Sequence, residues 1–239
     1  YRSYKDSIRP GHAEYGFFKK YGQYADWVGA GRASGRETAS RVAGGAVAKA
    51  VLDQMGIDVI AYTIASHGIK IKEPVTYEFA KENYRKNEIN CPDLALAEEM
   101  KKDILKVKAD GETAGGVIEC IARGVPAGLG EPVFDKMNAL LAHAVCSIGA
   151  IKGIEFGAGF GVADMLGAES NDEAYVDKAT GKVRFKTNHA GGILGGITTW
   201  EDIRFRCAVK PTPTVSVPQA TVNVEKMEDT ILSPITRRD

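Results

Sequence analysis

Apolar residues recur every three or four positions in three segments of the chain, which is the period of an amphipathic helix. The first segment, 34–56, opens with Ser34 and Glu37 at the spacing of a capping box, and the glycine at its end favours a stop there. The second, 133–148, follows a Glu-Pro pair, and the third, 92–111, begins with proline and aspartate and ends with lysines. The sequence therefore predicts three helices.

Shorter segments with β-branched or alternating residues and glycines at their edges predict strands. These segments are 57–71, 115–126, 151–160, 182–199 and 203–212. Strands and helices interleave without a regular βαβ alternation, so the order favours an α+β layered domain over a doubly wound sheet. Two polar segments remain. We interpret 73–91 as a surface connection and 167–183 as a mobile lid.

Charge and cysteine content narrow the class of protein. The 31 basic and 31 acidic side chains cancel, which argues against binding nucleic acid or a membrane surface through bulk charge. The cysteines are far apart and form no C-x-x-C pair, so neither a zinc site nor a secreted disulfide framework is indicated. No apolar run approaches the roughly 20 residues that cross a bilayer. We expect a soluble cytoplasmic protein in which a local cluster holds any bound anion.

One such cluster lies at the start of the long helix, where Arg32 and Arg36 flank Ser34. Two guanidinium groups there meet unpaired backbone N–H groups and the positive end of the helix dipole. The preceding "GAG" would let a ligand approach the backbone closely. On these residues alone, an ordinary glycine turn into a capped helix with two solvated arginines is the slightly favoured alternative.

Two further segments carry groups suited to phosphate or proton chemistry. His12 follows a Pro-Gly turn three residues after Arg9, and "AVKPTPT" presents Lys210 and Thr214 on a stretch stiffened by proline. A lone histidine such as His12 is more often structural or exposed, and a loop that closes a strand explains the Lys210 segment equally well. The remaining histidines lack metal-ligand spacing and are interpreted as structural: His67, His143 and His189. No P-loop occurs, and the weak glycine pattern in "GAGFGVADMLG" argues against a nicotinamide-dependent oxidoreductase.

Several long motifs occur in one order along the chain: "RPGHAEY", "GRASGRETASRVAGGAVAKA", "GGVIECIARGVPAGLGEPVFDKMNALLAHAVCSIGAIKGIEFGAGF", "TNHAGGILGGITT", "KPTPT" and "RRD". In this combination the sequence resembles the chorismate synthase family over nearly its whole length. The resemblance implies a single domain over 1–239. It also implies the family's fold, a layered β-α-β sandwich in which sheets enclose helices, assembled as a homotetramer.

The resemblance further implies a reaction, the anti-1,4-elimination of phosphate from 5-enolpyruvylshikimate-3-phosphate to give chorismate. This is the last common step of the shikimate pathway toward the aromatic amino acids, and it requires reduced FMN without net redox change. The implied protein is a carbon–oxygen lyase with a small-molecule substrate and no nucleic-acid or membrane partner. The absence of an obvious reductase segment favours an external reductant over flavin reduction by NADPH on the enzyme.

The family's functional positions transfer to this sequence residue by residue. The resemblance makes His12 the group that supplies a proton or stabilises the leaving phosphate, and Asp239 a proton relay from the flavin. The implied substrate-binding residues are Arg9, Arg36 and Arg237. The implied flavin-binding residues are Arg32, Ser34, Gly35, Ala150, Lys210 and Thr214, with Lys210 and Thr214 at the flavin phosphate.

The sequence also departs from the family pattern. Val28 stands where many members carry an arginine, and Arg238 replaces the histidine of the usual "RHD". The family's N-terminal "GESHG" segment, which bears its other catalytic histidine, and the part after "RHD" are not in this sequence. We therefore expect an incomplete form of a longer enzyme, inactive or poorly folded on its own. The alternative to an enzyme is a non-catalytic fragment or homologue that keeps the fold and binds flavin or an anion.

Overall fold

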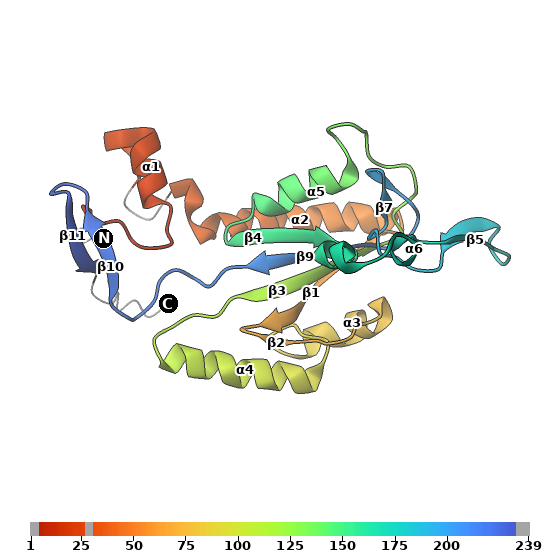
Figure 1. Cartoon of the computed structure of the whole chain (residues 1–239), viewed down its shortest axis with the longest axis horizontal. Coiled ribbons are helices and arrows are strands. Elements are labelled where there is room, and N and C mark those ends of the chain that lie inside the picture. Colours follow the sequence, from red (N-terminus) through yellow and green to blue (C-terminus); the bar gives the residue numbers. More distant parts are fainter. Residues whose placement is uncertain (1–4, 27–30, 233–239) are drawn as a thin grey trace.

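An antiparallel sheet forms the centre of the molecule in the computed structural model, which describes residues 5–26 and 31–232 (Figure 1). Its five strands, in the order β2-β1-β3-β9-β4, are β1 (Asp58–Ser66), β2 (Ile69–Lys70), β3 (Gly116–Arg123), β4 (Ile151–Phe156) and β9 (Ile203–Val209). Every neighbouring pair is antiparallel. The strands predicted in these segments are confirmed, and so is the α+β class.

Helices lie on both faces of this sheet (Figure 1). On one face are α2 (Thr38–Gln54) and α5 (Met137–Cys146), and on the other are α3 (Tyr77–Asn83) and α4 (Leu94–Ala109). The described residues thus place one large sheet between two helical layers. A sandwich in which sheets enclose helices needs a second large sheet, so for the described part of the chain that arrangement stays a prediction.

Smaller elements extend from this body. They are α1 (Glu14–Tyr21), α6 (Gly167–Ser170), the hairpins β5 (Ala174–Asp177) with β6 (Lys182–Phe185), β7 (Ile193–Leu194) with β8 (Ile197–Thr198), and β10 (Gln219–Asn223) with β11 (Glu228–Leu232). Short 3₁₀ helices lie at Gly22–Tyr24, Gly31–Ala33, Gly35–Glu37, Tyr84–Lys86 and Gly159–Asp164. No helix in the described part of the chain is long and apolar enough to span a membrane.

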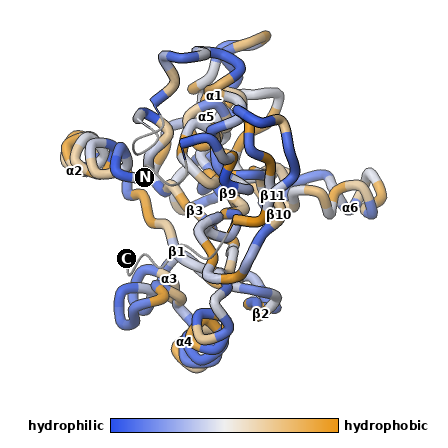
Figure 2. Tube along the Cα trace, turned by 90° about the vertical axis from the view of Figure 1, so that its left-hand side faces the viewer, coloured by the Kyte–Doolittle hydropathy of each residue, from blue (hydrophilic) through white to orange (hydrophobic). Residues whose placement is uncertain are grey.

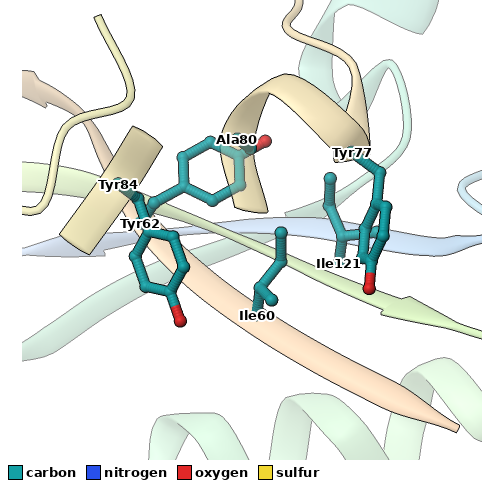
Figure 3. Packing of buried hydrophobic residues seen from close by; sticks show 6 residues of the cluster. All are labelled: Ile60, Tyr62, Tyr77, Ala80, Tyr84 and Ile121. Atoms are coloured by element: carbon teal, nitrogen blue, oxygen red, sulfur yellow. The ribbon is translucent and has the colours of Figure 1, made fainter. Parts of the chain in front are cut away.

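Aromatic and branched side chains fill the space between the sheet and α3. Figure 3 shows the cluster: Ile60, Tyr62, Tyr77, Ala80, Tyr84 and Ile121. Tyr62 and Ile121 are almost completely buried, and the Tyr62 hydroxyl donates a hydrogen bond to the buried Glu119 carboxylate. The Arg204 guanidinium lies 3.9 Å from the same carboxylate. A buried charge costs much less when it is paired in this way, so this network is compatible with the core.

The opposite face of the sheet is covered mainly by α5. Ile203 and Phe205 of β9 are buried there, against Met137, Leu141 and Val145. These three α5 residues are spaced four apart, so they lie on one side of the helix. The helical period in the sequence therefore identified the face of α5 that packs on the sheet.

The starts of two helices differ from the predictions. The capping box predicted for the first helix is wrong, because Ser34 accepts from the Arg36 N–H at 3.4 Å and caps a 3₁₀ turn, so α2 begins only at Thr38. The second helix begins at Met137 rather than at 133. The third helix is confirmed as α4, whose Asp93 side chain accepts from the Leu96 N–H at 3.0 Å.

Both polar segments contain regular elements that were not predicted. Segment 73–91 contains α3 and supplies the buried Tyr77 and Tyr84, so it is part of the core, and the prediction of a surface connection is wrong. Segment 167–183 contains α6 and β5, and β5 pairs with β6. The segment is therefore a hairpin rather than an irregular loop, and its mobility stays a prediction.

α2 is held to the body by few contacts. None of its residues is buried, and its exposed large apolar side chains are Val42, Val47 and Val51. Figure 2 shows this helix at one side of the molecule, with hydrophobic positions along its tube. Leu52 packs against the sheet cluster, and the Lys49 ammonium donates to the Val59 carbonyl at 2.5 Å. The contacts at the N-terminal end of α2 therefore decide where the residues just before it are placed.

Candidate functional site

The turn that carries His12 lies against the segment that follows β9. The Lys210 ammonium donates to the Gly11 carbonyl at 2.6 Å, although the two residues are 199 positions apart. Gly11 has a φ of +74°, and a Cβ there would lie 2.8 Å from the Pro213 Cβ. Glycine is required on both counts, because the left-handed conformation and the close contact each exclude a larger residue. The two predicted segments are therefore brought together.

His12 faces Thr214 across this contact. The His12 Nε2 and the Thr214 Oγ1 are 3.4 Å apart. Both residues line a crevice together with Arg9, Pro10 and Pro213. The crevice has a volume of about 10 Å³, which holds about one water molecule. It marks where the predicted residues meet and has no room for a flavin.

The N-terminal segment is fixed on the β10–β11 hairpin. The Ile8 N–H donates to the Val222 carbonyl at 3.3 Å, and the Val224 N–H donates to the Asp6 carbonyl at 2.7 Å. The Thr221 hydroxyl donates to the Ile8 carbonyl. In Figure 1 this hairpin and α1 lie together at one end of the molecule. Because β10 follows Lys210 closely in the chain, the same hairpin positions both sides of the His12 contact.

A larger cavity of about 390 Å³ is lined by residues of this N-terminal segment, of α1 and of the turn between β10 and β11. Its lining includes Phe17 and Phe18 of α1 and the charged residues Lys5, Asp6, Glu14, Asp26 and Glu225. Acidic residues outnumber the lysine in this lining, which disfavours a phosphorylated anion. We therefore place the predicted anion chemistry at the His12 crevice and not in this cavity.

Arg9 has an internal partner. The Glu14 carboxylate accepts from the Arg9 N–H at 2.8 Å and forms an ion pair with the Arg9 guanidinium. Both side chains are largely buried, at 13% and 19% exposed. Glu14 was not among the residues predicted from the sequence, although its position five residues after Arg9 at the start of a helix was a usable signal. An anion that binds Arg9 has to compete with this carboxylate.

The surroundings of His12 lower its pKa below the usual histidine value. Partial burial is the main cause, and the positive charges of Arg9 and Lys210 act in the same direction, whereas the negative charge of Glu14 opposes them. His12 is therefore neutral near neutral pH in the unliganded protein. A bound anion would add negative charge beside the ring and raise its pKa, so binding would favour the imidazolium.

This lowered pKa predicts a pH effect on stability. A histidine that binds its proton more weakly in the folded than in the unfolded protein makes protonation favour unfolding. The free energy of unfolding of the wild type should therefore fall relative to that of His12→Gln as the pH decreases through the usual histidine pKa of about 6.5. Urea unfolding of both proteins at several pH values measures the difference. An identical difference on both sides of that pKa would contradict the assignment.

Ala150 joins this group through the backbone. It follows α5, has a φ of +69°, and its carbonyl accepts from the Lys210 N–H at 2.9 Å. A positive φ is uncommon for alanine and indicates a backbone shape imposed by its surroundings. Ala150, Lys210, Gly11 and His12 thus form one continuous set of contacts, in which Lys210 is the link.

The residues before α2 form a second group. The side chains of Arg32 and Arg36 are exposed, and Ser34 caps the turn that contains Gly35. The structure gives no direct contact between these residues and His12. The two groups are connected through Arg41, whose guanidinium donates to the Glu37 carboxylate at 2.9 Å and to the Ser147 hydroxyl at 2.9 Å. Arg41 and Ser147 were not predicted, because their contact spans 106 positions.

Three of the predicted or discussed positions near the chain ends, Arg237, Arg238 and Asp239, lie outside the described residues, as does Val28. The expected roles of Arg237 as an anion ligand and of Asp239 as a proton relay therefore stay predictions. The same applies to the predicted contacts of every site residue with a flavin or a substrate.

Comparison with known proteins gives a consistent result. The family model described as Chorismate synthase matches residues 1–239. The chorismate synthase of Acetivibrio thermocellus is 66% identical over 239 residues, covering 100% of this chain and 61% of that protein. The chorismate synthase of Methanocella arvoryzae is 47% identical and is covered to 63% of its length. A solved structure, "Crystal Structure of Chorismate Synthase", aligns with a TM-score of 0.71 at 36% identity, covering 76% of this chain and 58% of that one. The chain thus spans less than two thirds of the length of each of these relatives.

Proposed function

The chain belongs to the chorismate synthase family, whose model matches residues 1–239, and on this premise we propose that it functions in the formation of chorismate. The proposed reaction is the anti-1,4-elimination of phosphate from 5-enolpyruvylshikimate-3-phosphate, a carbon–oxygen lyase reaction without net redox change. The single observation that supports it best is the contact of the Gly11–His12 turn with Lys210 and Thr214, because it gathers residues from opposite ends of the sequence at one place; the Lys210 N–H also reaches the Ala150 carbonyl.

The donor set around Lys210 fits a flavin mononucleotide. Lys210 offers an ammonium and Thr214 a hydroxyl, which are suitable partners for the cofactor's phosphate. Ala150 is half-buried and has a small side chain, which leaves room for a flat ring beside it. The exposed guanidinium groups of Arg32 and Arg36 add positive charge near the start of α2. We therefore assign a set of six residues to the flavin, as the family resemblance implies: Arg32, Ser34, Gly35, Ala150, Lys210 and Thr214.

The protein's own contribution to the reaction is binding and proton placement. Reduced FMN, when bound, supplies electron density to a ring whose C–H bond no adjacent carbonyl acidifies. Arg9 and Arg36 hold the anionic substrate, and binding of that anion favours the imidazolium of His12. His12 Nε2 then donates a hydrogen bond or a proton to the departing phosphate, which lowers the cost of its developing charge. The elimination also removes a hydrogen from the substrate ring, and Asp239 is assigned as the residue that would relay the resulting proton away from the site.

The wider biological assignments follow from the same premise. The proposed pathway is the shikimate route to aromatic amino acids, in the cytoplasm, with the assembly being a homotetramer. An external reductant supplies reduced flavin in this proposal. The alternative function is flavin or anion binding without turnover.

One anaerobic assay separates these two functions. The protein is incubated with dithionite-reduced FMN and 5-enolpyruvylshikimate-3-phosphate, and chorismate absorbance and inorganic phosphate are followed together. We expect the two products to appear in equal amounts, and neither to appear when the flavin is omitted or left oxidised. Flavin binding without release of phosphate would instead establish the non-catalytic alternative.

A further inference from the structure

Arg41 connects the two groups of site residues, and we propose that it is a positioning residue that fixes the turn before α2 relative to the Ala150 loop. Its Nε donates to both oxygens of Glu37, each at 2.9 Å. Its Nη1 and Nη2 donate to the Ser147 hydroxyl at 2.9 Å and to the Ser147 carbonyl at 3.1 Å. One guanidinium thus binds two elements that are far apart in the sequence.

Each end of this link lies directly beside a predicted ligand contact. On one side, the Glu37 N–H donates to the Ser34 carbonyl at 3.2 Å, so Glu37 belongs to the turn that carries Arg36. On the other side, Ser147 is the C-terminal cap of α5 and lies three residues before Ala150. A shift of Arg41 would therefore change the separation between the turn and Ala150.

The geometry argues for a positional role rather than a purely stabilising one. The Arg41 and Glu37 side chains are 41% and 34% exposed, and exposed ion pairs of this kind contribute little to stability. The contact with Ser147 is different, because the carbonyl there is one of those that a helix C-terminus leaves unpaired. The planar guanidinium satisfies that carbonyl, the hydroxyl and both oxygens of a carboxylate simultaneously through a rigid fork of five donors, whereas an ammonium has only three donors on a flexible stem. The Ser147 hydroxyl also donates to the Ala144 carbonyl at 2.6 Å, so the acceptor itself is held in place.

The catalytic consequence rests on the proposed function. The substrate arginine Arg36 and the flavin contact Ala150 lie on the two sides of the link, and small errors in the relative position of reactants reduce turnover steeply. Loss of the link should therefore lower kcat more than it weakens the binding of either ligand alone.

The test uses the full-length protein with Arg41→Gln and Arg41→Lys, and Lys86→Gln as the matched control. Lys86 forms an exposed i,i+4 ion pair with Glu82 at 3.3 Å that links no distant element. The measurements are kcat, the Kd for reduced FMN, and amide hydrogen exchange of residues 147–151. We expect both Arg41 variants to lose about tenfold or more in kcat with a change in Kd below about threefold, and to exchange faster at 147–151. The control should match the wild type in all three.

Each possible result either supports or overturns the proposed role of Arg41. A kcat within about twofold of the wild type in Arg41→Gln, or unchanged exchange at 147–151, would overturn it. If Arg41→Gln does not fold, Ser147→Ala removes the hydroxyl that accepts from Arg41, together with its bond to the Ala144 carbonyl, and should still accelerate that exchange. Unchanged exchange in this variant would be equally decisive. If the wild type itself forms no chorismate, the proposed function fails while the exchange measurement still accepts or rejects the role of Arg41.

Discussion

Replacing His12 with alanine should slow the release of phosphate by about 10²- to 10⁴-fold, the range for loss of a general acid. The Kd for reduced FMN should change by less than about threefold, because the cofactor contacts assigned to Lys210 and Ala150 do not use the imidazole. The structural reason is the position of the ring, which lies 3.4 Å from the Thr214 hydroxyl and beside Arg9 in the crevice. Stopped-flow measurement of phosphate release at saturating flavin and substrate gives the rate.

His67→Ala is the control for this substitution. His67 is 58% exposed, and its Nδ1 lies 2.8 Å from the Asp103 carboxylate. It therefore has a carboxylate nearby, as His12 has Glu14, but it lies outside the assigned site. We expect wild-type turnover from this variant. Turnover of His12→Ala within about threefold of the wild type would exclude His12 as the proton donor.

The fold was predictable wherever the spacing of apolar residues in a segment matched one buried or one exposed face of a strand or helix. β1 and β3 carry β-branched residues between glycines, β9 alternates apolar residues with arginines, and α4 has both an aspartate cap and a basic end, so local sequence sufficed. Segment 73–91 was misassigned because charged residues surround its apolar ones. Tyr77 and Tyr84 bury their rings while their hydroxyls bond to Asp58 and Arg85, so tertiary packing rather than composition decides the segment's place.

Only the motif residues of the candidate site could be predicted from the sequence. The Pro-Gly turn before His12 and the proline-stiffened segment after Lys210 are visible in the sequence, and the structure joins them through the Gly11 carbonyl. The supporting contacts were not visible. Arg41 meets Ser147 across 106 positions, and no local pattern specifies which helix end a guanidinium will reach. The placement of Arg36 relative to Ala150 depends on that contact, so it required the tertiary structure.

Replacing Lys210 with alanine should raise the Kd for reduced FMN by roughly 10- to 150-fold, since a hydrogen bond to a charged group contributes about 1.5–3 kcal/mol. The change also removes the bond from the ammonium to the Gly11 carbonyl, so the His12 turn loses one of its attachments. Because the positive charge of Lys210 lowers the pKa of His12, that pKa should rise in the variant. Anaerobic fluorescence titration measures the Kd, and NMR titration of the histidine ring measures the pKa.

Lys152→Ala provides the control for the lost charge, because Lys152 is an exposed lysine on β4, the same strand that follows Ala150. Both variants lower the net charge equally, so a general electrostatic effect on flavin binding would appear in both. A local phosphate contact instead predicts weakened binding in Lys210→Ala alone, with less dependence of the Kd on salt than in the wild type. Equal affinities in the two variants would remove Lys210 from the flavin site and leave it as a structural tie between the His12 turn and the end of β9.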